Sequence, residues 1–522
     1  MQPYYRPEWT CGRYDSTHKA AIFYNLIEGM SYFFEDYSAV VLGELLKAPR
    51  NGCVSLVDVA KQTGILTESL EPFFEELVRL NLLTHSIPTA EGIADYRQQI
   101  CKFRREQAVN TVKTTKEKLP MAVSSAEMDY MEKVGGITSV MFELTYNCSE
   151  KCIHCYNIGA TRNDAEASGR GSLCELTLND YKRIIDQLYE KGVVKVCLSG
   201  GDPFSKPFAW DIIEYLYEKG IAFDIFTNGQ RIVGDTERLA NFYPRLVGVS
   251  LYSGVAEVHD RITRIKGSWE KSMAVIKGLT DLAVTVEIKC CVMRPNLKSY
   301  YMIADIAQQV GATAQFEVSV TDSIDGDKCA SKFLRLTPQE LEVVLRDDNI
   351  PLYVGKEAPN FGGEPRDMVE NGCGAGYNTF CITPDGDMIP CCAFHLAFGN
   401  LKSQSVEEIF ENSDIRKWWV GLTLQQYEDC GRHDYCAYCN LCAGNNHSEN
   451  GTPIKAGENN CYMAKVRYDL AKKMRNGHDP LHGKSLKECL AEMPDYKPTR
   501  LQRVRDNETE KVDKCVLPKV TL

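Results

Sequence analysis

The sequence lacks any apolar run long enough to cross a membrane. Its longest apolar stretches fall short of the ~18 residues that span a bilayer. The first twenty residues mix aromatic and polar side chains and lack the basic-then-apolar order of a secretion signal. We therefore expect a cytoplasmic protein without a membrane partner.

A surplus of positive charge is also missing. The 522 residues carry 60 Lys and Arg against 71 Asp and Glu, a formal net charge of −11. Binding to nucleic acid depends on phosphate contacts from surplus Lys and Arg. The composition therefore argues against a nucleic-acid partner.

The cysteines lack the regular spacing of a disulfide scaffold. The chain has 22 of them, and most crowd into two zones, 148–155 and 373–461. This distribution is typical of metal clusters in a reducing compartment rather than of disulfides. The length and the 44% hydrophobic content allow two to four folded domains.

The first zone is Cys148-Ser-Glu-Lys-Cys152-Ile-His-Cys155, which follows the apolar run Ser139 to Thr145. Three thiolates on one tight loop can bind three irons of a cubane cluster and leave the fourth iron without a protein ligand. An open metal position is where catalytic metal sites do their chemistry. The alternative is a structural zinc site with His154 as the fourth ligand.

This loop closely resembles the CxxxCxxC signature of the radical S-adenosylmethionine (SAM) superfamily, and Tyr156 stands where that family places an aromatic residue beside the adenine. The resemblance implies a [4Fe-4S] cluster whose open iron binds the amino and carboxylate groups of SAM. It further implies an enzyme that cleaves SAM reductively to a 5'-deoxyadenosyl radical, with an electron donor such as a flavodoxin or ferredoxin. The cofactor carries the difficult chemistry, and the protein supplies position and exclusion of water.

From Ser139 onward, short β-branched runs alternate with helical patterns. The expected strands are Ser139 to Thr145, Val193 to Ser199, Ile221 to Thr227, Leu246 to Tyr252, Val284 to Met293 and Thr313 to Val320. The expected helices between them are Thr177 to Glu190, Phe208 to Lys219, Thr236 to Phe242, Trp269 to Leu282 and Lys298 to Val310. Such alternation predicts right-handed βαβ units with a parallel sheet. Six strands predict an α/β fold, a partial (βα)6 barrel.

Polar motifs follow successive strands, at the ends where parallel barrels carry their chemistry. Gly200-Gly201-Asp202-Pro203 follows the second strand, Asn228 follows the third, and Ser250 ends the fourth. In the family that the cysteine loop resembles, a Gly-Gly-Glu-Pro-like motif holds the SAM amino group, and Asp202 stands where Glu is commoner. The resemblance also implies that Asn228 and Ser250 contact the ribose, and both side chains suit hydroxyl recognition.

The segment His259 to Arg264 resembles the family segment that supplies an arginine to the SAM carboxylate. The usual arginine position holds Thr263, so Arg261 or Arg264 serves instead, or neither does. Either arginine could also cap a helix or form a surface ion pair.

The second cysteine zone resembles the SPASM extension of radical SAM enzymes. Its cysteines are Cys373, Cys381, Cys391, Cys392, Cys430, Cys436, Cys439, Cys442 and Cys461. Asp385-Gly386 between two apolar runs predicts a hairpin that returns Cys391 toward Cys373.

The SPASM resemblance implies two auxiliary [4Fe-4S] clusters. The ligands of the first would be Cys373, Cys391 and Cys442 with Cys381 or Cys392, and those of the second Cys430, Cys436, Cys439 and Cys461. His433 is the alternative to Cys436, which we prefer because it completes a four-cysteine site. A zinc ribbon is the alternative for the whole zone.

The N-terminal region predicts a winged-helix domain. Helical patterns cover Ser38 to Ala48, Ser55 to Thr63 and Thr67 to Leu83, and a short strand is possible at Leu82 to His85. The third helix is acidic, with Glu68, Glu71, Glu75 and Glu76, and an acidic helix does not enter a DNA groove. The pattern resembles the peptide-binding winged-helix module of peptide-modifying enzymes. A dimerisation or packing domain is the alternative.

The expected domains are a peptide-recognition-like winged helix (1–95), a polar linker (96–135), the radical SAM barrel (136–325), the SPASM region (326–470) and a tail (471–522). The resemblances together predict a maturase that abstracts hydrogen from a residue of a precursor peptide and installs a crosslink or a related modification. The alternatives are a sulfatase-maturase-like enzyme that forms formylglycine, and a non-catalytic iron-sulfur carrier or regulator. No catalytic side chain is assigned.

Overall fold

The computed structural model describes residues 2–111, 124–157, 175–322, 329–350, 367–369 and 371–497. Part of the predicted linker (112–123) and the end of the predicted tail (498–522) lie outside the described residues.

The N-terminal region combines three helices with a small antiparallel sheet. Its elements are β1 (Tyr4–Tyr5), β2 (Thr10–Asp15), β3 (Ala20–Asn25), β4 (Met30–Glu35), α1 (Asp36–Leu45), β5 (Cys53–Val54), α2 (Leu56–Thr63) and α3 (Thr67–Arg79). Strands β2, β3 and β4 form one sheet, in this order. The three predicted helices are confirmed, but the sheet was not predicted. The strand expected at Leu82 to His85 is reduced to an isolated bridge between Thr84 and Tyr5.

Strand β3 is buried along its whole length because both of its faces are covered. Ala21 and Phe23 pack into the core of α1, α2 and α3. Ile22 and Tyr24 face the other way and pack with residues at the beginnings of the barrel strands, such as Ala222. The small sheet therefore joins the three helices to the barrel.

The region predicted as a polar linker forms α4 (Ala90–Thr111) and α5 (Ser125–Val134), which contact the barrel. On α4, Arg97 donates to the carbonyl oxygen of Ala240 at 2.9 Å, and Arg104 donates to that of Ala283 at 2.9 Å. Arg97 and Arg104 therefore attach α4 to the barrel, although most of the other side chains of this helix are exposed or only partly buried.

The barrel strands follow in the predicted order. They are β6 (Ser139–Glu143), β7 (Lys195–Ser199), β8 (Ala222–Thr227), β9 (Leu246–Ser250), β10 (Val286–Cys291) and β11 (Thr313–Glu317). All neighbouring pairs are parallel. The helices are α7 (Leu178–Glu190), α8 (Ala209–Lys219), α9 (Thr236–Ala240), α10 (Ala256–Thr263), α11 (Ser268–Asp281) and α12 (Met302–Val310). The parallel α/β core is thus confirmed, and α10 is an addition.

The cysteine-rich region extends the barrel sheet. Strand β12 (Thr379–Ile382) pairs in parallel with β6, and β13 (Asp387–Ile389) and β14 (Gly399–Asn400) continue outward in antiparallel pairs. The predicted hairpin at Gly386 is confirmed, with a φ of +94° that favours glycine. The remaining helices are α13 (Cys329–Leu334), α14 (Pro338–Val344), α15 (Val406–Asn412), α16 (Asp414–Val420), α17 (Ala443–Asn450), α18 (Glu458–Arg475) and α19 (Leu486–Glu492).

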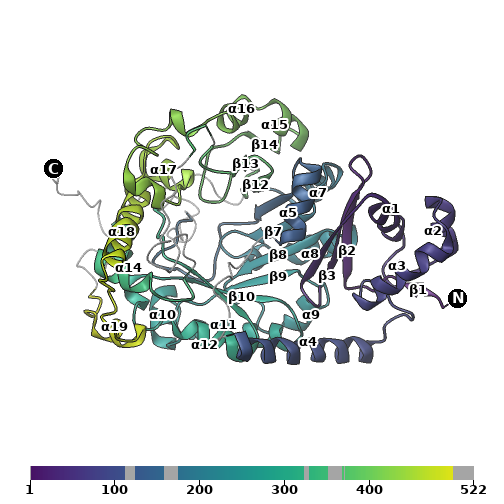
Figure 1. Cartoon of the computed structure of the whole chain (residues 1–522), viewed down its shortest axis with the longest axis horizontal. Helices are drawn as coiled ribbons and strands as arrows, with labels where there is room; N and C mark the ends of the chain where they lie inside the picture. The colour runs from purple at the N-terminus through teal and green to yellow at the C-terminus, as the bar shows by residue number, and fades with distance from the viewer. Residues whose placement is uncertain are drawn as a thin grey trace.

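Figure 1 shows the N-terminal elements and the cysteine-rich region on opposite sides of the parallel sheet. Among the described helices, none is both long enough and apolar enough to cross a bilayer.

Candidate functional site

The three-cysteine loop leaves the carboxyl end of β6 and is held by backbone hydrogen bonds. Lys151 N donates to Thr263 O and Ile153 N donates to Ile262 O, both at 3.0 Å. Cys155 N donates to Cys152 O at 3.1 Å, which closes a tight turn between the two thiols. The end of α10 therefore fixes the path of the loop.

Two glycines after β7 allow the loop to cross the end of that strand. A Cβ atom on Gly201 would lie 2.5 Å from the carbonyl oxygen of Asn147 and 2.6 Å from that of Tyr146. The amide of Gly201 donates to Thr145 O at 2.7 Å, and that of Asp202 donates to Asn147 O at 3.1 Å. Gly200 and Gly201 thus allow the backbone of the chain's own loop to approach closely.

Asp202 is fully buried beside this crossing. Its Oδ1 accepts a hydrogen bond from Thr227 Oγ1 at 2.5 Å, while its Oδ2 has no hydrogen-bond partner among the described residues. Burial raises the pKa of this carboxyl to about 6. A cation placed against Oδ2 would satisfy a buried acceptor that otherwise costs free energy. The SAM amino group fits this requirement.

The three thiols are partly buried, and burial shifts their ionisation. It raises the pKa of Cys148 to about 12 and that of Cys155 to about 11, and it raises the pKa of Cys152 well above its ordinary value. Thiols of this kind are protonated near neutral pH, so bound iron would replace their protons.

The three thiols of the loop suit an iron-sulfur cluster better than a single metal ion. In the described part of the chain, no three His, Cys, Asp or Glu side chains converge as they would around a single metal ion. A cubane binds each thiolate through a different iron, so its ligands need not converge on one point. The three thiols of the loop therefore fit a [4Fe-4S] cluster by number and chemistry.

The other residues predicted to contact SAM are distributed as follows. The amide of Asn228 lies 3.2 Å from Cys148 Sγ, and Ser250 ends β9. Tyr156 lies near Cys392, which together with burial raises the pKa of the Tyr156 hydroxyl well above its ordinary value, so Tyr156 links the loop to the second cysteine zone. Arg261 is exposed on α10, and Arg264 ends that helix in a left-handed conformation with a φ of +59°.

The second cysteine zone contains two groups. In the first, Cys391 lies near Cys373, Cys392 and Cys442. Its pKa is well above the ordinary value, mainly because of burial and to a smaller extent because of these neighbouring thiols. Cys392 also lies near Cys442. Cys381, the alternative ligand, is buried in β12, and its pKa is raised well above the ordinary value by burial and then by Glu143, Cys392 and Cys391.

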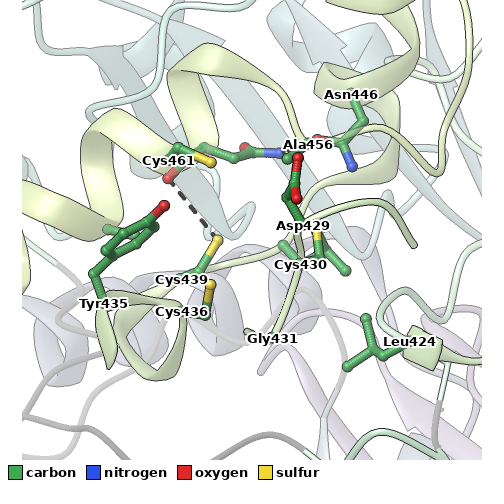
Figure 2. Close-up of a pocket in the computed structure, with 13 residues that line it drawn as sticks. Leu424, Asp429, Cys430, Gly431, Tyr435, Cys436, Cys439, Asn446, Ala456 and Cys461 are labelled. Atoms are coloured by element: carbon green, nitrogen blue, oxygen red, sulfur yellow. Dashed lines mark hydrogen bonds between the residues drawn. The ribbon is translucent and has the colours of Figure 1, made fainter. Parts of the chain in front are cut away.

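The second group lines a pocket between α18 and the loop before α17. Figure 2 shows Cys430, Cys436, Cys439 and Cys461 around this pocket. Cys436 is buried, whereas His433 is exposed and stacks on Tyr435 at a ring distance of 4.9 Å. The geometry therefore brings Cys436, rather than His433, to the other thiols. No disulfide joins the cysteines whose side chains the structure describes.

Two buried glutamates near the thiols were missed by sequence reasoning. Burial raises the pKa of Glu143 and that of Glu150 to about 8. Glu143 accepts from Tyr146 Oη at 3.3 Å, and Glu150 Oε2 lies 3.4 Å from Cys152 Sγ. Two features of the sequence point to these residues: Glu143 ends an apolar strand, and Glu150 lies between two of the predicted ligand cysteines.

Comparison with known proteins identifies two regions of the chain. Residues 142–299 match the Radical SAM superfamily, and residues 373–443 match SPASM, described as an iron-sulfur cluster-binding domain. These two domains imply a SAM-binding [4Fe-4S] cluster and auxiliary iron-sulfur clusters.

Two relatives each match more than half of this chain. The antilisterial bacteriocin subtilosin biosynthesis protein AlbA of Bacillus subtilis is 29% identical over 317 residues, which are 58% of this chain and 66% of AlbA, slightly under two thirds of its length. The AdoMet-dependent heme synthase of Methanosarcina barkeri is 25% identical over 326 residues, 58% of this chain and 90% of that protein.

A solved structure has a similar fold. Streptococcus suis SuiB bound to the precursor peptide SuiA matches with a TM-score of 0.51 at 13% identity, over 88% of this chain and 99% of SuiB. The fold, the three-thiol loop and the two matched domains lead to one conclusion: the protein is a radical SAM enzyme, with its radical SAM domain at residues 142–299 and a SPASM domain at residues 373–443.

Proposed function

We propose that this enzyme abstracts a hydrogen atom from a residue of a ribosomally made precursor peptide and installs a crosslink or a related modification. The observation that carries the proposal is a small domain with an edge strand, β4, packed on a radical SAM barrel that is followed by a SPASM domain. Two similar proteins favour a peptide substrate: AlbA is named for bacteriocin biosynthesis, and SuiB was solved with a precursor peptide.

The residues of the loop have separate roles in this proposal. Cys148, Cys152 and Cys155 hold the [4Fe-4S] cluster, which with SAM supplies a radical able to abstract hydrogen. Asp202 accepts from the SAM amino group through its Oδ2, which has no partner in the described part of the chain. Tyr156 packs against the adenine, Ser250 contacts the ribose, and the carboxylate is bound by Arg261 or Arg264. A flavodoxin or ferredoxin of the cytoplasm supplies the electron.

The SPASM region would hold two auxiliary [4Fe-4S] clusters. The first is bound by Cys373, Cys391, Cys392 and Cys442, of which Cys392 lies near Cys442. The second is bound by Cys430, Cys436, Cys439 and Cys461, which line one pocket.

The N-terminal domain would capture the peptide by strand addition. In the described part of the chain, β4 pairs only with β3, so no strand lies along its other edge. An extended peptide can add to such an edge, with side-chain pockets giving selectivity. Met30, Tyr32 and Phe34 alternate along β4 and so share one face, Met30 is 50% exposed, and Phe34 packs edge-on against Phe73 of α3 at 6.1 Å. The captured segment would therefore carry apolar side chains.

Substitutions on β4 test this capture site. Met30→Lys with Tyr32→Lys should weaken peptide binding about tenfold or more and leave SAM cleavage without peptide unchanged. The control is Val57→Lys, because Val57 is 54% exposed on α2 of the same domain. Equal peptide affinity of the two variants would show that β4 is not the capture edge.

The reaction itself is tested by coexpression with a short peptide encoded beside the gene. Mass spectrometry of the peptide should show loss of two hydrogens for a crosslink, and no loss when Cys152 is replaced by Ala. An aldehyde at a Ser or Cys would support the formylglycine alternative. A modified tetrapyrrole with an unmodified peptide would favour a reaction like that of the heme synthase relative, which is covered over 90% of its length.

A further inference from the structure

The side chain of Asn228 makes a contact that differs from the predicted ribose contact. Its Nδ2 donates to Cys148 Sγ at 3.2 Å, and the residue is only 5% exposed. Asn228 follows β8, whereas Cys148 follows β6, and β7 lies between these strands. Gly200 and Gly201 lie at the end of β7, where the loop that carries Cys148 passes close to their backbone.

The orientation of the Asn228 amide is fixed by its other hydrogen bonds. Its Oδ1 accepts from the backbone amide of Gln230 at 3.0 Å. Only the oxygen of an amide can accept, so the nitrogen must face Cys148. The carbonyl oxygen of Asn228 accepts from Ser272 Oγ at 2.8 Å. Asn228 is therefore held on both sides, with its N–H group directed at the sulfur.

The three thiols differ in their surroundings. The sulfur of Cys148 also accepts a hydrogen bond from the backbone N–H of Glu150 at 3.4 Å, so two N–H groups point toward it. Cys152 Sγ faces the carboxylate of Glu150 at 3.4 Å. Hydrogen bonds to the sulfurs of an iron-sulfur cluster are among the factors that set its reduction potential. A donor stabilises the reduced form because the added electron increases the negative charge on the thiolates.

We infer that Asn228 is a positioning residue that raises the reduction potential of the cluster held by Cys148, Cys152 and Cys155, through its hydrogen bond to the Cys148 thiolate. The inference rests on the cluster assignment of the proposed function, and it needs no statement about the substrate. Through this bond, Asn228 makes the cluster easier for a one-electron donor to reduce.

The test is a potentiometric titration of the reconstituted full-length protein without SAM, with dithionite as reductant and electron paramagnetic resonance as readout. The signal of this cluster is the one that Cys152→Ala removes. In Asn228→Ala, the ratio of reduced to oxidised cluster at a fixed potential should fall about threefold, roughly 30 mV for a one-electron couple. Asn228→Asp should lower it at least as much, because it keeps the acceptor for Gln230 and replaces the donor by a charge.

Ser272→Ala is the matched control, because it removes a hydrogen bond to the carbonyl of Asn228 and none to a thiol. It should leave the potential unchanged. An equal shift in Ser272→Ala would mean that the turn alone matters, and would overturn the inference. An unchanged potential in Asn228→Ala with weaker SAM binding would overturn it in favour of the ribose contact. If no signal depends on Cys152, the cluster assignment itself fails, and the inference fails with it.

Discussion

At the scale of single residues, Gly201 is the position where one added methyl group should displace the three-cysteine loop. The methyl of Gly201→Ala would lie 2.5 Å from Asn147 O, a backbone atom that cannot rotate away. We expect a loss of about 1–3 kcal/mol in the free energy of unfolding, as for other overpacked sites, and weaker iron incorporation. Thermal unfolding and iron analysis of the reconstituted protein measure both effects.

Gly234→Ala is the control for this substitution. A Cβ atom there would have no heavy atom within 4 Å, and the residue has no positive φ. This variant should match the wild type in both measurements. Similar behaviour of the two variants would contradict the role of Gly201 in seating the loop.

A second residue-scale prediction separates Cys436 from His433. If Cys436 is a ligand, Cys436→Ala should reduce bound iron from about twelve to about eight atoms per chain, the loss of one four-iron cluster. His433→Ala should keep the full amount, because His433 is exposed outside the pocket. Iron loss in the histidine variant alone would reverse the assignment, and zinc in place of iron would favour the ribbon alternative.

The local spacing of residues predicted the two cysteine zones but not the partners of each side chain. Cys148, Cys152 and Cys155 lie within eight residues, so their proximity follows from the sequence. The contact between Asn228 and Cys148 joins residues 80 positions apart and depends on the order of three strands. Residue spacing does not determine whether Cys436 or His433 faces the pocket. In the structure Cys436 is buried and His433 is exposed.

At the scale of elements, α5 is joined to the barrel by a buried ionic cluster. Glu127 pairs with Lys195 of β7 at 3.2 Å, and their side chains are 2% and 5% exposed. Arg245 lies 3.9 Å from Glu127 and also pairs with Asp224 of β8. Removing one charged side chain leaves a buried charge of opposite sign without its partner. In comparable buried pairs this lowers the free energy of unfolding by about 3–5 kcal/mol.

The pH dependence of stability should report this cluster. Burial alone would raise the pKa of Glu127, but Arg245 and Lys195 lower it below the ordinary value. A carboxylate with a lowered pKa stabilises the fold above its unfolded pKa, about 4.3, and this contribution is lost as the pH falls through the folded pKa. Glu127→Gln should therefore lower the unfolding temperature at pH 7, and the difference from the wild type should shrink below about pH 4.

Glu408→Gln is the control for the ionic cluster. Glu408 caps α15 at the surface, where glutamine serves the same capping role. It should change the unfolding temperature little at any pH. A constant difference between Glu127→Gln and the wild type at all pH values would contradict the electrostatic explanation.

The alternation of strands and helices predicted all six barrel strands, because each buried parallel strand is a short β-branched run bounded by helical patterns. Two parts of the fold lacked such a signal. Strand β3 is buried on both faces and reads Ala-Ala-Ile-Phe-Tyr-Asn, without the alternation expected of a half-buried strand. Strand β12 joins β6 from far along the chain, with Thr379 opposite Ser139, and no local pattern encodes that pairing.

At the scale of the whole molecule, the N-terminal domain, in which we propose that the peptide is captured, and the cluster loop lie at opposite ends of the barrel. The N-terminal domain packs on Val194, Ala222, Tyr243 and Ala283, which lie at the amino ends of successive strands. The three cysteines follow the carboxyl end of β6. Figure 1 shows the sheet between the N-terminal helices and the cysteine-rich region. A captured peptide must therefore pass along the height of the sheet.

This arrangement predicts a minimum spacer in the substrate. Strands of five residues rise about 17 Å, so at least roughly five extended residues must separate the captured segment from the modified residue. Removing five spacer residues from an accepted precursor should lower modification more than tenfold and leave its affinity unchanged. Replacing the same residues by Gly and Ser, without a change in length, is the control. Full modification of the shortened peptide would contradict capture on β4.

The most direct test of the account is SAM cleavage by the anaerobically reconstituted and reduced enzyme. Wild type should form 5'-deoxyadenosine, and the variant with Ala at Cys148, Cys152 and Cys155 should form none while it keeps about eight iron atoms in the SPASM region. Retained cleavage in the triple variant would contradict the assignment of these three cysteines as the ligands of the SAM cluster.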